Sequence, residues 1–252
     1  MTSGNFTRTE LLIGSEGLQK LKECTVAVVG LGGVGSYAAE ALCRAGIGHF
    51  ILIDFDTVGP TNLNRQLLAT SQTIGKPKTE LMRQRILDIN PEARIICHQS
   101  FIDQENRAQL LEGADYIIDA IDSLGPKIGL LEYLAKSERK LISVMGAGNR
   151  MDPSQIHIAK LKQSHQCPLA RRVRKFLRRR GVEGNFPCVY SSEAALIPDP
   201  EIESDTELII ERGRQRQTIG SISYMPAIMG MMAASWVINS ILKGESGSSC
   251  CR

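Results

Sequence analysis

Three side chains in the first half of the chain could together bind the phosphates of a nucleotide: Arg65, Lys78 and Asp122. A guanidinium presents a planar fork of donors to phosphate oxygens, and an ammonium is a mobile point charge for the same ligand. Mg²⁺ prefers one or two carboxylates together with water and substrate phosphate, so Asp122 suffices as its protein ligand. The set predicts a site for a magnesium-bound polyphosphate, with further polar contacts from Asn62, Asn64, Gln66 and Ser123.

A glycine-rich run ahead of these residues predicts where the phosphates lie. An apolar strand over residues 25–29 leads into Gly30-Leu-Gly-Gly-Val-Gly35 and then into a helix. Gly32 and Gly33 let the backbone turn sharply and lie close to phosphate, while the start of the helix directs unpaired N–H groups at the anion. Asp54, at the end of the next strand, is placed to accept hydrogen bonds from ribose hydroxyls.

The glycine run alone would fit NAD as well as ATP. Arg65 and Lys78 decide against NAD, because the helix terminus already neutralises the pyrophosphate of a dinucleotide. The chain also offers no convincing residue for a hydride-transfer site. ATP with Mg²⁺ is therefore the expected cofactor, and an NAD(P)-linked oxidoreductase is the alternative from a different class.

Alternating strand and helix patterns position these groups. Over the first 145 residues, β-branched runs alternate with helical patterns, which predicts an α/β fold: a Rossmann-like, mostly parallel sheet with helices on both faces. The carboxyl ends of parallel strands meet at one edge, where Asp122 would hold the metal and Asp119 would orient the turn. Strands are expected at 25–29, 50–53, 94–98, 116–118 and 141–145, and helices near 34–45, 77–89, 104–112 and 126–137.

The pattern loosens after residue 148, which suggests a nucleotide-binding domain over 1–148, a smaller C-terminal lobe over 149–243 and a flexible tail over 244–252. The lobe holds an alternating run at 155–162 and an acidic loop or β-connection at 198–220. Residues 224–242 are apolar, but Pro226 and several hydroxyl and amide side chains would be costly in lipid. A buried helix is expected there, and one that could lie at a dimer interface.

A basic helix at 168–180 points to an acidic partner. Seven cations and no acid lie between residues 171 and 180. A solvated face is the plain alternative, but like charges at i, i+4 destabilise a helix unless phosphates neutralise them. The residues expected to contact the partner are Arg171, Arg172, Arg174, Lys175, Arg178 and Arg179.

Composition limits the remaining possibilities. With 252 residues, 42% hydrophobic and 23% charged, the chain is ordinary for a globular protein, and its net charge of +3 is small. The seven cysteines form no C-x-x-C pair and the four histidines lack ligand spacing, so no structural zinc is expected. Cys188 has no adjacent histidine and is expected in the core. Without a secretory signal pattern, a cytoplasmic chain with reduced thiols is expected.

Six motifs, in order and at the expected spacing, resemble the ubiquitin-activating-like adenylating family, whose bacterial members activate sulfur carriers. The resemblance implies that Gly33 lies against the phosphates, that Asp54 holds ribose and that Asp122 carries magnesium. Asn62, Arg65 and Lys78 would grip the triphosphate. The motifs lie at residues 30–35, 54–56, 62–66, 75–78, 89–91 and 119–122.

The resemblance also implies a homodimer. Arg8 is similar to an amino-terminal arginine that reaches the γ-phosphate in the partner subunit and neutralises charge as pyrophosphate leaves. A monomer would then be nearly inactive.

The second half departs from the sulfur-carrier activators, since it has neither paired C-x-x-C motifs nor a cysteine on a crossover loop. It resembles instead the branch that dehydrates threonylcarbamoyladenosine in tRNA, at residues 145–153, 158–161, 167–170 and 189–193. The implied reaction is ATP-dependent cyclisation through an acyl adenylate, with tRNA on the basic helix. Adenylation of a ubiquitin-like sulfur carrier is the alternative, and peripheral membrane contact stays open.

Overall fold

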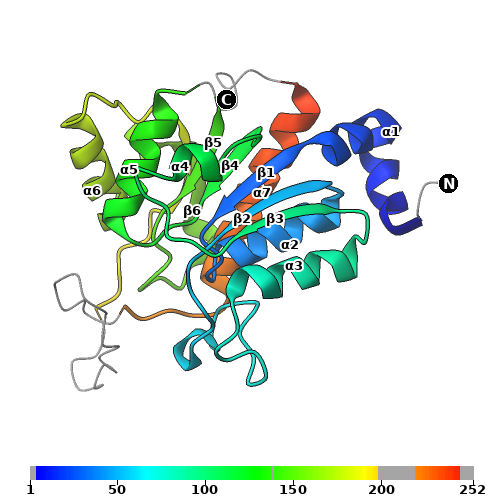
Figure 1. The fold of residues 1–252 in the computed structure, drawn as a ribbon. Coiled ribbons are helices and arrows are strands. Elements are labelled where there is room, and N and C mark those ends of the chain that lie inside the picture. The colour runs from blue at the N-terminus through cyan, green and yellow to red at the C-terminus, as the bar shows by residue number, and fades with distance from the viewer. Residues whose placement is uncertain (1–3, 138, 198–218, 245–252) are drawn as a thin grey trace.

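One seven-stranded sheet organises the computed structural model, which describes residues 4–137, 139–197 and 219–244 (Figure 1). The strand order is β3-β2-β1-β4-β5-β7-β6; all neighbouring pairs are parallel except β6 and β7, which are antiparallel. The strands are β1 (Thr25–Val29), β2 (His49–Ile53), β3 (Arg94–His98), β4 (Tyr116–Asp119), β5 (Lys140–Val144), β6 (Ile156–Lys160) and β7 (Pro187–Ser191).

Helices cover both faces of this sheet. Phe50 and Leu52 of β2 face one core cluster, and Ile51 and Ile53 face the other, because successive side chains of a strand point to opposite faces. Both faces are covered, so the central strands are apolar throughout rather than alternating. The helices are α1 (Thr7–Glu23), α2 (Gly35–Ala45), α3 (Lys78–Ile89), α4 (Arg107–Leu110), α5 (Leu124–Ala135), α6 (Pro168–Arg178) and α7 (Tyr224–Lys243).

The α/β prediction is confirmed, with two differences in helix length. The helix expected at 104–112 shrinks to α4, because Asp103 Oδ1 accepts hydrogen bonds from the amides of Glu105 (2.8 Å) and Asn106 (3.2 Å) and holds a turn there. The basic helix ends at Arg178, and Gly181 follows with a φ of 75°.

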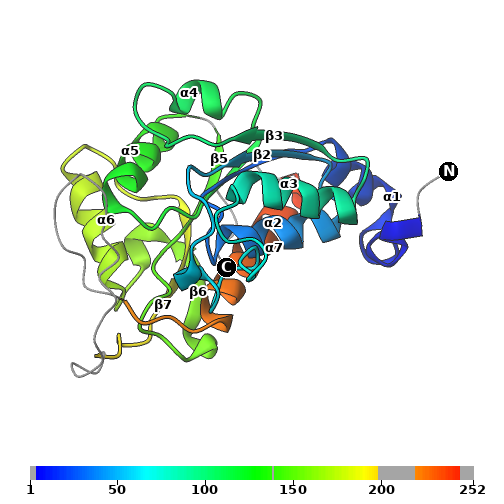
Figure 2. The ribbon, with the colours of Figure 1, turned by 60° about the horizontal axis from the view of Figure 1, so that its bottom comes forward.

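The region expected to form a C-terminal lobe shares its sheet and core with the first half. Strands β6 and β7 extend the same sheet beyond β5, so the boundary at residue 148 falls within one packed unit. Helix α7 packs beside α2 (Figure 2). It is long and apolar enough to cross a membrane, but most of its residues are buried inside the protein, as expected for a core helix. The acidic stretch at 198–218 and the tail at 245–252 lie outside the described residues.

Candidate nucleotide-binding site

The glycine loop joins β1 to α2, and its backbone packs so closely that two of its glycines leave no room for a Cβ atom. Gly30 has a φ of 90°, and a Cβ there would lie 2.9 Å from the carbonyl oxygen of Ala120. A Cβ on Gly35 would lie 1.8 Å from the Gly30 carbonyl oxygen, so neither position tolerates a larger residue. No side chain caps the first turn of α2; the Ser36 amide donates to the Gly32 carbonyl oxygen (3.2 Å), and an uncapped helix start of this kind can receive an anion.

The last helix supports the underside of this loop. A Cβ on Gly33 would lie 3.3 Å from Pro226 Cβ, at the start of α7. One turn later, a Cβ on Gly230 would lie only 2.3 Å from the Val34 carbonyl oxygen. Helix α7 therefore packs directly against the glycine loop and supports its backbone. Gly230 is required there, because a side chain at this position would clash with the loop.

Asp54 and Lys78 lie together at the carboxyl end of β2. Asp54 Oδ2 accepts a hydrogen bond from the Leu31 amide (2.6 Å), and Oδ1 accepts one from the Asp56 amide (2.8 Å). Burial raises the pKa of the Asp54 carboxyl above its ordinary value, although Lys78 and both amides oppose the shift. The carboxylate is thus held against the glycine loop, and its contact with ribose stays a prediction.

Lys78 is nearly fully buried, with 4% of its surface exposed. Its Nζ lies 3.0 Å from Asp56 Oδ2, and the Asp56 side chain is 46% exposed. The structure makes Asp56 the counter-ion of Lys78. A tertiary contact of this kind has no signature in local sequence.

The segment after β2, cyan below the sheet in Figure 1, brings together the other expected phosphate ligands. Asn62 Oδ1 accepts a hydrogen bond from the Gly59 amide (3.1 Å) and closes a turn. Arg65 Nη1 donates to the Thr61 carbonyl oxygen (2.8 Å) and to Asn64 Oδ1 (3.0 Å). This leaves Asn62 and Arg65 beside the glycine loop, since a Cβ on Gly33 would also lie 3.3 Å from the Arg65 carbonyl oxygen.

Gln66 and Asn64 differ in burial and in hydrogen bonding. Gln66 is buried, and its Oε1 has no hydrogen-bond partner among the described parts of the chain; its Nε2 lies beside Gly32. An unsatisfied buried amide at a candidate ligand site is consistent with a missing polar partner. Asn64 is exposed, and its Nδ2 donates a hydrogen bond to the Ser221 carbonyl oxygen (3.0 Å). This bond connects the segment after β2 to the residues just before α7.

A buried ion pair holds the loop that carries Asp122. Lys127 Nζ lies 2.8 Å from Asp119 Oδ2 and donates to the carbonyl oxygens of Ile121 (3.0 Å) and Val144 (2.9 Å). Asp119 Oδ1 accepts from the Ile121 amide (3.1 Å), so Asp119 orients the turn as expected. Lys127 was not anticipated, because a lysine within an apolar helix pattern gives no sign of its partner.

Asp122 itself is exposed at the carboxyl edge of the sheet. Its Oδ1 accepts a hydrogen bond from Ser123 Oγ (3.1 Å). Within the described residues no group of three or more His, Cys, Asp or Glu side chains could hold a metal ion. A single exposed carboxylate fits Mg²⁺ bound mainly by water and phosphate, the arrangement this ion prefers.

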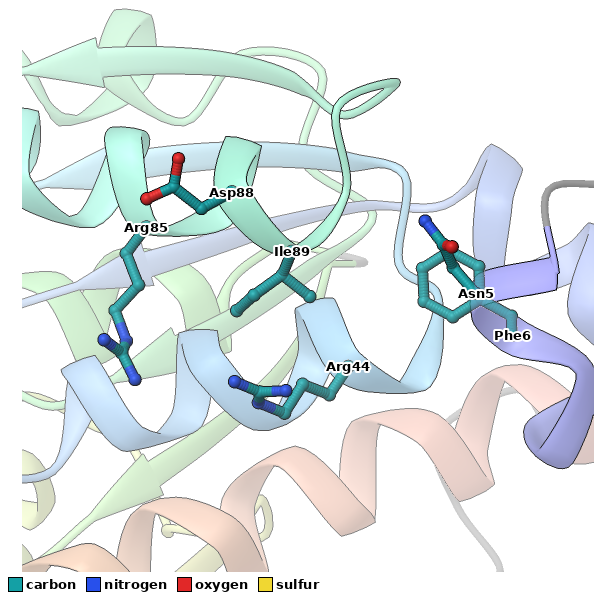
Figure 3. Close-up of a pocket in the computed structure, with 6 residues that line it drawn as sticks. All are labelled: Asn5, Phe6, Arg44, Arg85, Asp88 and Ile89. Carbon is teal, nitrogen blue, oxygen red and sulfur yellow. The ribbon is translucent and has the colours of Figure 1, made fainter.

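Arg8 lies far from the glycine loop of its own chain. The neighbouring Phe6 packs near Gly46, at the end of α2 remote from the loop. A pocket of about 530 Å³ lies at this same end, lined by Asn5, Phe6, Arg44, Arg85, Asp88 and Ile89 (Figure 3). It contains none of the expected site residues, and Arg8 can reach a nucleotide site only if that site belongs to another subunit.

The cations of α6 differ in their surroundings. Arg171, Arg172, Lys175, Arg178 and Arg179 are exposed. Arg174 is half-buried: its Nη1 donates to Ser164 Oγ and to the Ser164 carbonyl oxygen (2.6 Å), which fixes the segment before the helix. Arg180, beyond the helix, pairs with Glu132 at 3.0 Å.

Three of the described cysteines are poor candidates for an activated thiol. Burial raises the pKa of the Cys24 and Cys43 thiols to about 12 and that of Cys97 to about 11. Cys188 lies in the core, as expected, and Cys167 Sγ accepts a hydrogen bond from the Ala170 amide at the start of α6. Protonated, buried thiols are poor nucleophiles.

A mostly parallel sheet with a glycine loop, a buried carboxylate and a buried lysine at its carboxyl edge is typical of a nucleotide-binding α/β protein. The chain belongs to the ThiF family, which it matches over residues 6–249.

Similarity to individual proteins extends over nearly the whole chain. It is 40% identical over 242 residues to the tRNA threonylcarbamoyladenosine dehydratase of Bacillus subtilis, and the alignment covers 94% of both chains. The structure is similar to that of the tRNA N6-threonylcarbamoyladenosine dehydratase of Escherichia coli in complex with ATP, with 35% identity, a TM-score of 0.85 and coverage of 95% and 94%. The AMP complex of the same enzyme has 37% identity, the same TM-score and the same coverage.

Proposed function

We propose that this protein uses ATP to dehydrate threonylcarbamoyladenosine in tRNA, closing a ring through an acyl-adenylate intermediate. Similarity to dehydratases across 94% of the chain carries the proposal. The nucleotide site supports it, because Lys78 and Arg65 supply cations suited to a triphosphate and Asp54 lies beside the glycine loop, where it could accept hydrogen bonds from ribose. The related E. coli enzyme has been solved with ATP and with AMP, the substrate and a product of adenylation.

In the first step a carboxylate oxygen of the modified adenosine attacks the α-phosphate. The new C–O–P linkage forms as the bond to the β-phosphate breaks, and pyrophosphate leaves with the electron pair. Gly32 and Gly33 place the phosphates, while Asn62, Arg65 and Lys78 hold the triphosphate and stabilise the charge that develops on pyrophosphate. Mg²⁺ bound at Asp122 would neutralise further phosphate charge.

In the second step a group within the same modified nucleoside displaces AMP and closes the ring. Because both reacting groups belong to one nucleoside, the step is effectively unimolecular once the substrate is bound. No activated protein thiol is needed, in agreement with the buried cysteines of the described core.

The tRNA would be held by the exposed cations of α6. These supply phosphate contacts, whereas Arg174 stabilises the start of the helix. The helix lies at the β6–β7 side of the sheet (Figure 1), so its cations could hold the RNA while one nucleoside enters the carboxyl edge.

The active form would be a homodimer in the cytoplasm. Arg8 lies at the wrong end of α2 to serve its own glycine loop, and a second subunit would bring it to the γ-phosphate. Neutralising charge there would assist pyrophosphate release.

Mass spectrometry of bulk tRNA from cells with and without the protein tests the reaction. The modified adenosine should be lighter by one water only when the protein is present, and no difference would refute the dehydratase function. ATP–pyrophosphate exchange separates the main alternative: exchange should depend on modified tRNA, whereas exchange driven by a small protein ending in Gly-Gly would indicate sulfur-carrier activation.

A further inference from the structure

Arg150 is a buried cation that has no counter-ion among the described residues. Only 3% of its surface is exposed, and its Nε and Nη1 have no hydrogen-bond partner among the residues that the structure describes. Buried charges are normally paired, because removing a guanidinium from water without compensation is among the most costly features of a fold. An arginine left unpaired by the described parts of the chain can receive an anion from a bound ligand.

Two acids of the adjoining loops, Glu193 and Asp152, are engaged by other groups. Glu193 Oε2 accepts hydrogen bonds from the amides of Met151 (2.9 Å) and Asp152 (2.9 Å), and Oε1 accepts one from the Met151 amide (3.1 Å). Asp152 accepts from the Ser154 amide (2.9 Å) and from Gln155 Nε2 (2.8 Å). These carboxylates shape the turn after Arg150 rather than neutralise it.

The backbone that carries Arg150 is fixed. Asn149 has a φ of 56°, a left-handed conformation that redirects the chain immediately before the arginine. The Asn149 amide donates to the Gly220 carbonyl oxygen (2.8 Å), and its own carbonyl oxygen accepts from the Leu196 amide (2.9 Å). The arginine is therefore held by two other segments of the chain.

This position borders the nucleotide site. The loop of residues 145–155 leaves the carboxyl end of β5, at the edge where Asp122 also lies. Next to Gly220, the Ser221 carbonyl oxygen accepts from Asn64, whose Oδ1 in turn accepts from Arg65. A short series of hydrogen-bonded segments thus connects Arg150 to the residues expected to hold the triphosphate.

We propose that Arg150 binds the substrate carboxylate that the protein adenylates, an assignment that rests on the proposed function. A guanidinium can bind both carboxylate oxygens, and its charge offsets the repulsion between the carboxylate and the α-phosphate as they approach. One oxygen then attacks phosphorus, the bond to pyrophosphate breaks, and Arg150 neither gives nor takes a proton. The other oxygen, now an acyl oxygen, stays hydrogen-bonded to the guanidinium.

Comparing modified with unmodified tRNA tests this role, because only the modified tRNA carries the carboxylate. The full-length chain should bind modified tRNA more tightly, and Arg150→Met should lower that affinity roughly 10- to 100-fold, the loss of a charged hydrogen-bonded contact. Affinities for ATP and for unmodified tRNA should not change. Arg94→Met is the matched control, since Arg94 is exposed on edge strand β3. It should leave all three affinities unchanged.

Thermal unfolding of the ligand-free protein provides a second measurement. Removing an uncompensated buried charge should leave the melting temperature unchanged or raise it. A large decrease would show that Arg150 serves the fold, and would overturn the proposal.

The remaining outcomes distinguish other anions. Weaker ATP binding by Arg150→Met would identify an ATP phosphate as the ligand, and equally weaker binding of unmodified tRNA would identify an RNA phosphate; either contradicts the proposal. If the unaltered protein binds modified tRNA but supports no tRNA-dependent ATP–pyrophosphate exchange, the proposed function fails instead. If exchange occurs and Arg150→Met leaves both exchange and affinity intact, this inference alone is wrong.

Discussion

Two buried lysines flank the nucleotide site, and their partners assign them different roles. Lys127 has three acceptors within 3.0 Å, namely Asp119 and two carbonyl oxygens, which match the three donors of an ammonium. Among the described residues Asp56 is the one acceptor of Lys78, and that carboxylate is half exposed. All three ammonium donors of Lys127 are hydrogen-bonded, so we assign it a structural role. The Lys78 ammonium has N–H donors left over from its bond to Asp56, and these can bind a phosphate.

We expect Lys127→Met to destabilise the protein by about 3–5 kcal/mol, because it leaves Asp119 buried and unpaired. The double variant Lys127→Met with Asp119→Asn should recover much of that loss. Urea unfolding of the two single variants and the double variant measures the coupling. Strictly additive losses would contradict the assignment of the pair as one unit.

The positions of single residues could be predicted where a sequence motif determines the local backbone geometry. The glycine run and Asp54 lie together as predicted, since both belong to consecutive turns at one sheet edge. The roles of Asp56, Lys127 and Arg150 could not be predicted, because each depends on partners brought close only by the folded sheet.

At the scale of elements, Glu40 joins α2 to α3. Its carboxylate accepts from Arg85 (2.6 and 3.1 Å) on α3 and from Arg44 (2.8 Å) on α2. Burial opposes ionisation, but the two arginines outweigh it and hold the pKa of Glu40 below its ordinary value of 4.5. Because the pKa is lower in the folded than in the unfolded chain, the ion pair stabilises above pH 4.5, and its contribution is lost as pH falls through the folded value.

Glu40→Gln should therefore cost roughly 1–3 kcal/mol at neutral pH and should reduce the further loss of stability on acidification. Denaturant unfolding at neutral pH and below pH 4.5 measures both effects. Glu80→Gln is the control, since the Glu80 and Arg83 side chains are 55% and 40% exposed, and it should change stability by less than about 1 kcal/mol. An equal acid sensitivity of Glu40→Gln and the unaltered protein would contradict the assignment.

The basic helix gives a prediction of its own. Arg171→Ala should weaken tRNA binding and reduce the slope of log affinity against log salt by about 0.7–0.9, as expected for one lost phosphate contact. Arg180→Ala should change the slope less, because Glu132 already neutralises Arg180. Fluorescence titration over a salt series measures both slopes, and identical slopes for all three proteins would argue for a merely solvated helix face.

Elements with a strong period and clear end signals were predictable. Five strands, α2, α3, α5 and the buried α7 appear close to where the sequence places them. Helix α1 escaped prediction because Gly14 and Gly17 interrupt its apolar pattern, and Gly14 adopts a non-helical φ of 75°. Strand β7 is a five-residue run whose partners, β5 and β6, are separated from it in sequence.

At the scale of the whole molecule, the position of Arg8 predicts that catalytic activity depends on dimer formation. If Arg8 serves the partner's site, mixing Arg8→Ala subunits with Lys78→Met subunits restores one intact site in each mixed dimer. Random reassociation should then recover about a quarter of full activity, although each variant alone is nearly inactive. ATP–pyrophosphate exchange on the mixture measures the recovery, and none at all would place Arg8 outside the partner's site.

The support that α7 gives the glycine loop has a consequence for protein synthesis. The ribosome delivers Gly33 and Val34 early, whereas Pro226 and Gly230, which contact the loop from α7, are made much later in synthesis. A nascent chain therefore carries the phosphate loop long before it can hold the loop in shape. A ligand stabilises only the state that binds it, so ATP would protect finished copies and leave interrupted ones to degradation.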